Sequence, residues 1–205
     1  MFSIQQVNFA SLIATNAARH RIAATSYKRD IELQEFGARR AQGPDGALSA
    51  SKYSYIGGFD GTSNVLAGKL YGIPVTGTHA HSYVMSFDYS EFQSSNENNV
   101  PHLELKHRTD QDRVETNFYS ECVQFRTQLG KHTKINVNEA NDGELLAFAS
   151  YAVAYPESFV ALIDTYDVLK SGLINFMAVA LALNSLGYCK FGIRIDSGDL
   201  AYLSR

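Results

Sequence analysis

The sequence predicts an α/β fold, a parallel sheet covered by helices. Segments typical of strands and of helices alternate along most of the 205-residue chain. Polar and charged side chains follow each predicted strand, where ligands bind at the carboxyl edge of a parallel sheet. Apolar residues make up 45% of the sequence and charged residues 19%, as in ordinary folded domains.

The first 30 residues predict a helix. Apolar side chains recur at helix-like intervals at Phe2, Val7, Leu12, Ile13 and Ala17. The absence of an acid before Asp30 also fits a transit peptide, but the apolar spacing favours an ordinary packed helix.

From residue 31 onward, predicted strands and helices alternate. Pro44 and Asp45 mark one helix start, and Gly187 marks a helix end. The predicted strands are residues 31–36, 73–77, 159–163 and 191–195, and the predicted helices are residues 45–55, 63–70, 144–155 and 168–186, with another starting at 199.

A polar stretch from about 88 to 138 interrupts this alternation. It contains SSNENN and KHRTDQDR and lacks sustained periodicity, so it is interpreted as an insertion with one helix near 119–129. The predicted organisation is therefore an N-terminal helical segment, 1–30, and an α/β region, 31–205, that carries the insertion.

Charge and cysteine content limit the function classes. A net charge of −3 gives no reason to expect nucleic-acid binding, and no unbroken apolar run approaches the ~20 residues of a membrane span. Cys122 and Cys189 lack the spacing of a thiolate zinc site, and two cysteines form no disulfide framework. The expected location is the cytosol.

The polar residues after the predicted strands should meet at one edge of the sheet, which indicates an enzyme without naming its reaction. They are Arg39 and Arg40, Asp60 to Ser63, Thr78, His79, His81 and Ser82, Asp164 to Asp167, and Arg194 with Asp196 to Asp199.

Simpler interpretations stay open for several of these residues. Arg39 and Arg40 fit solvated surface charge, and Ser63 and Asp199 fit helix caps. His79 and His81 could suggest a metal site, but no third ligand stands at a supporting distance. Paired acids at the edge would also fit a barrel glycosidase, although such an enzyme needs no phosphate-binding arginines.

Three long strings carry a family resemblance. EFGARRAQGPDGALSASKYSYIGGFDGTSNVLAGKLYGIPVTGTHAHSYVMSF, DTYDVLKSGLINF and FGIRIDSGDLAYLS resemble nicotinate phosphoribosyltransferases of the eukaryotic type. The resemblance covers nearly the whole chain and is weakest between residues 88 and 138.

The resemblance implies part of an irregular (β/α) barrel of the type II phosphoribosyltransferase kind, with a second domain that includes residues 1–30. It implies a homodimeric enzyme of NAD biosynthesis, a ligase that forms nicotinate mononucleotide from nicotinate and phosphoribosyl pyrophosphate. The family couples this reaction to ATP hydrolysis and uses Mg²⁺, whose ligands the sequence does not identify.

The resemblance also assigns roles. His81 matches the family's phosphorylatable histidine, and Thr78 and Arg194 match its nicotinate-binding residues. Guanidinium groups suit phosphate, so Arg39 and Arg40 are expected to bind pyrophosphate. The other expected contributors are Asp196 for ribose or magnesium, Ser82 and Ser63 for substrate, and Phe36, which either stacks on the pyridine ring or packs in the core.

Two motifs of the family pattern have no counterpart here: an N-terminal tyrosine and a glycine-rich G-x-G-T-S phosphate loop. The alternatives are therefore a truncated, inactive fragment, an interaction-only product, or a relative that uses nicotinamide. Nicotinamide-using relatives carry an acid in place of Ser63, and an acid would repel the carboxylate of nicotinate.

Ser63→Asp should therefore shift substrate preference from nicotinate toward nicotinamide, because a carboxylate accepts from an amide and repels a carboxylate. A competition assay with both pyridines measures this ratio. Unchanged selectivity would contradict the role assigned to Ser63.

Overall fold

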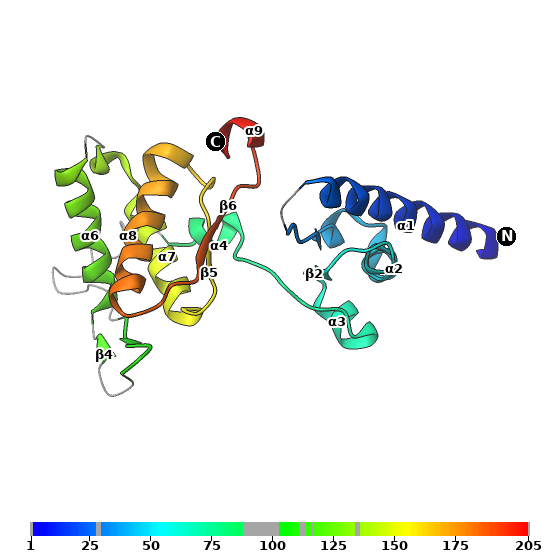
Figure 1. The fold of residues 1–205 in the computed structure, drawn as a ribbon, viewed down its shortest axis with the longest axis horizontal. Helices are drawn as coiled ribbons and strands as arrows, with labels where there is room; N and C mark the ends of the chain where they lie inside the picture. Colours follow the sequence, from blue (N-terminus) through cyan, green and yellow to red (C-terminus); the bar gives the residue numbers. More distant parts are fainter. Residues whose placement is uncertain are drawn as a thin grey trace. The chain divides into compact units, whose positions relative to one another are not determined.

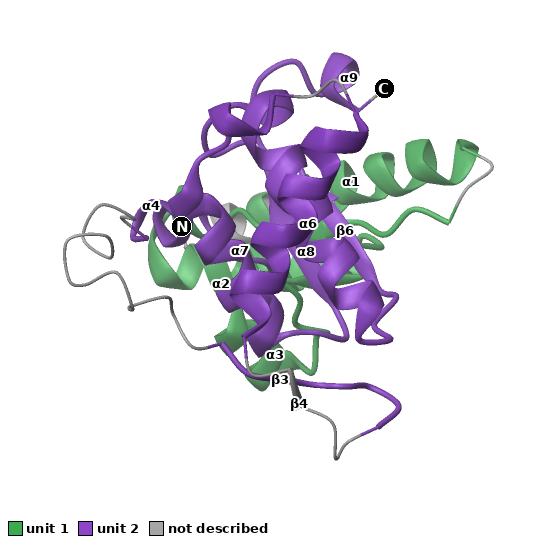
Figure 2. Cartoon of the chain, turned by 90° about the vertical axis from the view of Figure 1, so that its left-hand side faces the viewer, with its two compact units in different colours: residues 1–77 green, residues 78–205 purple. Residues whose placement is uncertain are grey.

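The structure is a computed structural model that describes residues 2–27, 30–87, 103–110, 114–115, 117–133 and 136–204. The chain forms two compact units, unit 1 (Met1–Gly77) and unit 2 (Thr78–Arg205), coloured separately in Figure 2. Each unit combines helices with one pair of parallel strands, so the predicted α/β class is confirmed. The boundary expected near residue 30 stays a prediction.

Unit 1 follows the predicted order. Its elements are α1 (Phe2–Ser26), β1 (Gln34–Glu35), the 3₁₀ turn η1 (Ala38–Arg40), α2 (Gly43–Ile56), β2 (Gly61–Thr62) and α3 (Val65–Tyr71). Strands β1 and β2 are parallel, pairing Gln34 with Gly61. The strand predicted at 73–77 is reduced to one bridge, between Val75 and Thr62, so that prediction was too long.

Local signals explain the helices of unit 1. Pro44 stands in the first turn of α2, where its missing N–H costs no helical hydrogen bond. Helix α3 begins after Asn64, whose side chain accepts from the amide of Ala67, so the cap is Asn64 and not Ser63. The predicted helix at the N-terminus is confirmed as α1, but Leu12 is 62% exposed and does not pack as expected.

Unit 2 starts with α4 (His81–Met85), and its two longest strands pair in parallel. The other elements are β3 (Leu105–Lys106), β4 (Val114–Glu115), α6 (Phe118–His132), η2 (Val137–Glu139), α7 (Asp142–Ala154), β5 (Phe159–Leu162), the π-helical turn η3 (Val168–Gly172), α8 (Leu173–Ser185), β6 (Phe191–Arg194) and α9 (Leu200–Leu203). Strand β5 pairs with β6 from Phe159 opposite Phe191 to Leu162 opposite Arg194.

The polar insertion contains more order than the sequence predicted. The helix expected near 119–129 is confirmed as α6, and an unpredicted antiparallel pair, β3 and β4, precedes it. Residues 88–102, including His102, lie outside the described part of the chain.

The core of unit 2 lies among α6, α7, α8 and β5, and Figure 1 shows the three helices side by side. Phe118, Phe148, Phe159 and Leu183 are fully buried there. Burial of each such side chain contributes roughly 1.5–3 kcal/mol. This core fixes the positions of β5 and β6, from whose carboxyl ends the site residues project.

One helical stretch in the described residues, Val168–Ser185, is long and apolar enough to span a membrane by length and composition alone. Half of it is buried inside the protein. Its residues Ala178, Val179 and Leu183 belong to the core of unit 2, and a core helix produces the same pattern.

Gly172→Ala should destabilise unit 2, because a methyl group there would meet the carbonyl oxygen of Ile163 at 2.0 Å. The expected loss in unfolding free energy is about 1–3 kcal/mol, or failure to fold. Gly192→Ala is the matched control, since its methyl group would lie 3.8 Å from Val160. Denaturant unfolding of both variants checks this, and equal stabilities would contradict it.

Candidate functional site

The Asp164 carboxylate connects three segments of unit 2. Asp164 follows β5, and only 3% of its side chain is exposed. One oxygen lies 3.1 Å from Nε2 of His81, the first residue of α4. The other accepts from the amide of Asp196 at 2.8 Å and from the hydroxyl of Ser197 at 2.6 Å, in the loop after β6.

These contacts keep Asp164 ionised. Burial by itself would raise the pKa of Asp164, but hydrogen bonds from Ser197, the Asp196 amide and His81 outweigh it and lower the pKa. A carboxylate can only accept, so the proton between it and a neutral His81 belongs to Nε2. The lone pair of the neutral imidazole then lies on Nδ1.

Arg194 lies beside this network, at the end of β6. Its guanidinium donates to the Thr78 hydroxyl at 2.6 Å and forms an ion pair with Asp196 at 3.0 Å. The structure thus brings together four of the predicted site residues: Thr78, His81, Arg194 and Asp196. Their chemical roles stay predictions, while their proximity is a finding.

The remaining polar residues of this edge have simpler partners. Asp167 accepts from the amides of Leu169 and Lys170 and caps η3, and Asp199 accepts from the Tyr202 amide and caps α9. The cap interpretation of Asp199 is therefore confirmed. Ser82 is exposed on α4.

His79 and His81 have different partners. It is buried, and its Nε2 accepts from the Leu162 amide at 3.1 Å. Burial, with smaller contributions from Arg194 and His81, lowers the pKa of His79 to about 4. Within the described residues no group of three or more His, Cys, Asp or Glu side chains could hold a metal ion. His79 instead fixes the end of β5, a role that the sequence did not suggest.

Unit 1 carries the other predicted site residues. Phe36, Arg39 and Arg40 lie on the segment after β1, and Ser63 follows β2. Phe36 is 39% exposed, so its interpretation as a core residue does not hold, and both arginines are exposed. A common pocket for these residues and those of unit 2 stays a prediction.

Asp60 comes before β2 and so lies at the amino end of the strand pair of unit 1, not at the carboxyl edge that the sequence predicted. Its carboxylate accepts from the Leu33 amide at 2.7 Å and pairs with Arg21. The hydrogen bond from Leu33 is the main reason that the pKa of Asp60 is lowered.

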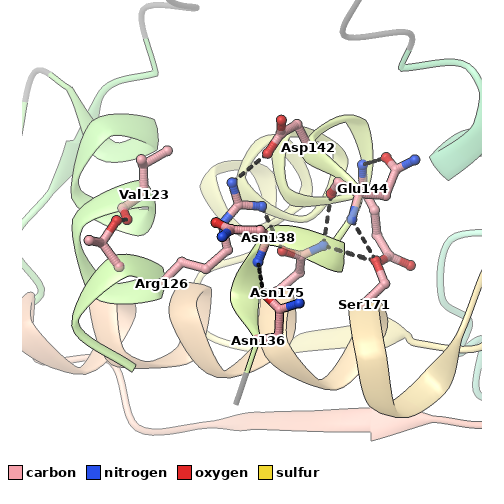
Figure 3. Close-up of polar contacts among 10 residues, drawn as sticks. Val123, Arg126, Asn136, Asn138, Asp142, Glu144, Ser171 and Asn175 are labelled. Atoms are coloured by element: carbon pink, nitrogen blue, oxygen red, sulfur yellow. Dashed lines mark hydrogen bonds and ion pairs between the residues drawn. The ribbon is translucent and has the colours of Figure 1, made fainter. Parts of the chain in front are cut away.

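Sequence reasoning missed a buried acid in unit 2. Glu144 on α7 is fully buried, and one of its oxygens accepts from the Ser171 hydroxyl at 2.5 Å and from the Asn175 amide group at 3.0 Å (Figure 3). Within the described part of the chain the other oxygen has no hydrogen-bond partner. Nearby, Arg126 pairs with Asp142 and donates to Asn175. Burial raises the pKa of Glu144 to about 7.

The fold and these contacts define an α/β protein with a polar site at the carboxyl ends of its parallel strands, where an imidazole, a guanidinium and a carboxylate meet. The nicotinate phosphoribosyltransferase (NAPRTase) family model matches residues 31–156. The chain belongs to the nicotinate phosphoribosyltransferase family.

Individual relatives agree with this assignment. The chain is 55% identical over 201 residues to nicotinate phosphoribosyltransferase 2 of Arabidopsis thaliana, covering 97% of this chain and 34% of that protein. It is 54% identical over 205 residues to the Caenorhabditis elegans enzyme, covering 97% of this chain and 34% of that one.

The crystal structure of human nicotinic acid phosphoribosyltransferase superposes with a TM-score of 0.79 at 48% identity, covering 94% of this chain and 36% of that one. The chain spans about a third of the length of the relatives it matches.

The buried Glu144 makes unit 2 sensitive to pH. Its pKa is about 7 in the folded protein and 4.5 without burial, so the folded state binds the extra proton between these values. This contribution to stability is fully present below pH 4.5 and is lost as the pH rises through about 7. The loss amounts to about 3 kcal/mol.

Glu144→Gln, which stays neutral, should therefore remove this decline. Denaturant unfolding at pH 5 and at pH 8 measures, at each pH, the difference in unfolding free energy between the variant and the original protein. If this difference in unfolding free energy is the same at pH 5 and at pH 8, the raised pKa of the buried Glu144 is contradicted.

Proposed function

We propose that the protein takes part in the nicotinate phosphoribosyltransferase reaction of NAD biosynthesis: nicotinate, phosphoribosyl pyrophosphate, ATP and water give nicotinate mononucleotide, pyrophosphate, ADP and phosphate. The observation that carries this proposal is the contact between His81 and the buried Asp164, in a chain of this family. The relatives named above are nicotinate enzymes, which favours nicotinate over nicotinamide as the substrate.

His81 is the proposed acceptor of the γ-phosphoryl group of ATP. Nε2 keeps its proton and donates a hydrogen bond to Asp164, so the lone pair of the neutral ring lies on Nδ1. In the proposed step this lone pair attacks the γ-phosphorus. The new Nδ1–P bond forms as the bond to the ADP oxygen breaks, and ADP leaves with that electron pair. The positive charge on the imidazole ring is then stabilised by the Asp164 carboxylate, as in other pairs of histidine and aspartate.

Arg194 and Thr78 are the proposed partners of the nicotinate carboxylate. A guanidinium binds a carboxylate through two parallel N–H donors, and the contacts with Thr78 and Asp196 hold this one in place before substrate arrives. Preorganisation of this kind lowers the entropy cost of binding. The exposed hydroxyl of Ser82 is a further proposed contact for substrate.

Departure of pyrophosphate leaves positive charge on the ribose and places negative charge on the leaving group. Asp196 is proposed to stabilise the ribose, and Arg39 and Arg40 are proposed to bind the pyrophosphate. Mg²⁺, when bound, would neutralise charge on the pyrophosphate. Asp196 is the exposed carboxylate suited to hold it together with substrate phosphates, because magnesium is commonly bound by one or two carboxylates and phosphate oxygens.

The proposal extends to the protein as a whole. The two parallel strand pairs would belong to an irregular barrel in a homodimer. The expected location is the cytosol, and two cysteines without a disulfide, Cys122 and Cys189, are consistent with a reducing compartment. The proposed partners are nicotinate, phosphoribosyl pyrophosphate, ATP and a second copy of the chain, and neither nucleic acid nor a membrane is expected.

Incubation with γ-labelled ATP should place an acid-labile label on His81. His81→Asn should abolish the label, and Asp164→Asn should reduce its rate at least about tenfold, because an amide no longer fixes the proton on Nε2. His132→Asn, at an exposed position on α6, is the control and should label normally. Formation of nicotinate mononucleotide is assayed in parallel. Equal labelling of the Asp164 variant would contradict the mechanism, and label on another residue would remove His81 as acceptor.

A further inference from the structure

The side chain of Glu35 is buried at the end of β1 in unit 1. Only 9% of the residue is exposed. One carboxyl oxygen accepts from the hydroxyls of Ser51 and Thr62, each at 2.7 Å, and the other accepts from the Gly37 amide at 2.5 Å. Three donors from three different segments therefore converge on one acid.

Each donor fixes a particular segment. The Gly37 amide opens the turn that continues into η1 with Arg39 and Arg40. Thr62 is fully buried, and its hydroxyl donates to Glu35. The same hydroxyl oxygen accepts from the Asn64 amide at 3.0 Å.

The backbone adds a further link between these segments. The Ser63 amide donates to the carbonyl oxygen of Glu35 at 3.0 Å. The loop from Thr62 to Asn64 is therefore held at Thr62 by the side chain of Glu35 and at Ser63 by its backbone carbonyl.

The contacts of the cluster suit a carboxylate. An ionised acid offers two oxygens and no donor, so it satisfies three donors without conflict. A glutamine would keep one oxygen and turn an NH₂ group toward either the Gly37 amide or the two hydroxyls. In the first case two donors would meet in a buried site and leave a polar group unsatisfied. In the second case both hydroxyl protons would have to turn away from Glu35 to other acceptors, such as the Ala47 carbonyl for Ser51, and the present contacts would be lost.

We propose that Glu35 is a positioning residue for substrate binding. Its carboxylate holds the turn that carries Phe36, Arg39 and Arg40 and the loop that carries Ser63, while it contacts no substrate itself. The inference rests on the proposed function, because the residues that Glu35 positions are themselves proposed to bind phosphoribosyl pyrophosphate and nicotinate. Exposed arginines bind a phosphate more tightly when their backbone is already ordered, because less conformational entropy is lost on binding.

The central experiment compares Glu35→Gln with Glu32→Gln. Both variants make the same chemical change and lose the same charge, at positions three residues apart. Glu32, however, is exposed and accepts a long hydrogen bond from the Gln34 side chain at 3.4 Å. Calorimetry measures the affinity for phosphoribosyl pyrophosphate, and steady-state kinetics separate its KM from kcat. Thermal unfolding and labelling of His81 by ATP report on the rest of the molecule.

Glu35→Gln should weaken binding of phosphoribosyl pyrophosphate at least about tenfold and raise its KM, with a much smaller change in kcat. Glu32→Gln should bind as the original protein does. Both variants should accept label on His81 normally. A folded Glu35→Gln variant with unchanged affinity and unchanged KM would overturn the inference.

A second pair of variants decides the case if Glu35→Gln does not fold. Thr62→Val removes the hydroxyl that links Glu35 to Asn64 at nearly constant volume, whereas Thr62→Ser keeps the hydroxyl. Weaker nicotinate binding in the valine variant, restored in the serine variant, supports the inference, and equal binding by the two overturns it. If the original protein binds no phosphoribosyl pyrophosphate and forms no nicotinate mononucleotide, the proposed function itself fails and the inference fails with it.

Discussion

The candidate site of unit 2 depends on one buried carboxylate. Asp164 is joined to α4 through His81 and to the loop after β6 through Asp196 and Ser197. Without these donors, a nearly unexposed acid would be costly, because a buried charge is tolerated only when it is hydrogen-bonded or paired. The same contacts that make the burial of Asp164 tolerable also orient the imidazole and place Arg194 beside it.

Unit 1 uses the same arrangement with different partners. Glu35, like Asp164, is an acid at the end of a parallel strand that gathers donors from separate segments. In each unit the reactive or exposed groups lie at the ends of short elements or in the turns beside them, which have little stability of their own. A buried carboxylate gives such a segment a fixed geometry that helix and sheet packing alone does not provide.

The sequence predicted the helices well, because caps and apolar periodicity are local signals. It predicted the strands less well, since the bridge at Val75 depends on a neighbouring segment and not on local propensity. The family motifs identified His81 and Arg194, but nothing in a motif distinguishes a surface histidine from a buried acceptor such as His79. Glu144 was missed for a similar reason: a helix in the core can carry one buried acid when the donors come from distant residues.

The tautomer of His81 tests the central claim most directly. Nitrogen-15 NMR of the imidazole, recorded where the ring is neutral, distinguishes a proton on Nε2 from one on Nδ1. The account predicts the Nε2-protonated form in the original protein and a mixture of tautomers in Asp164→Asn. A ring protonated on Nδ1 in the original protein would contradict it. So would a ring that stays fully protonated on Nε2 in Asp164→Asn.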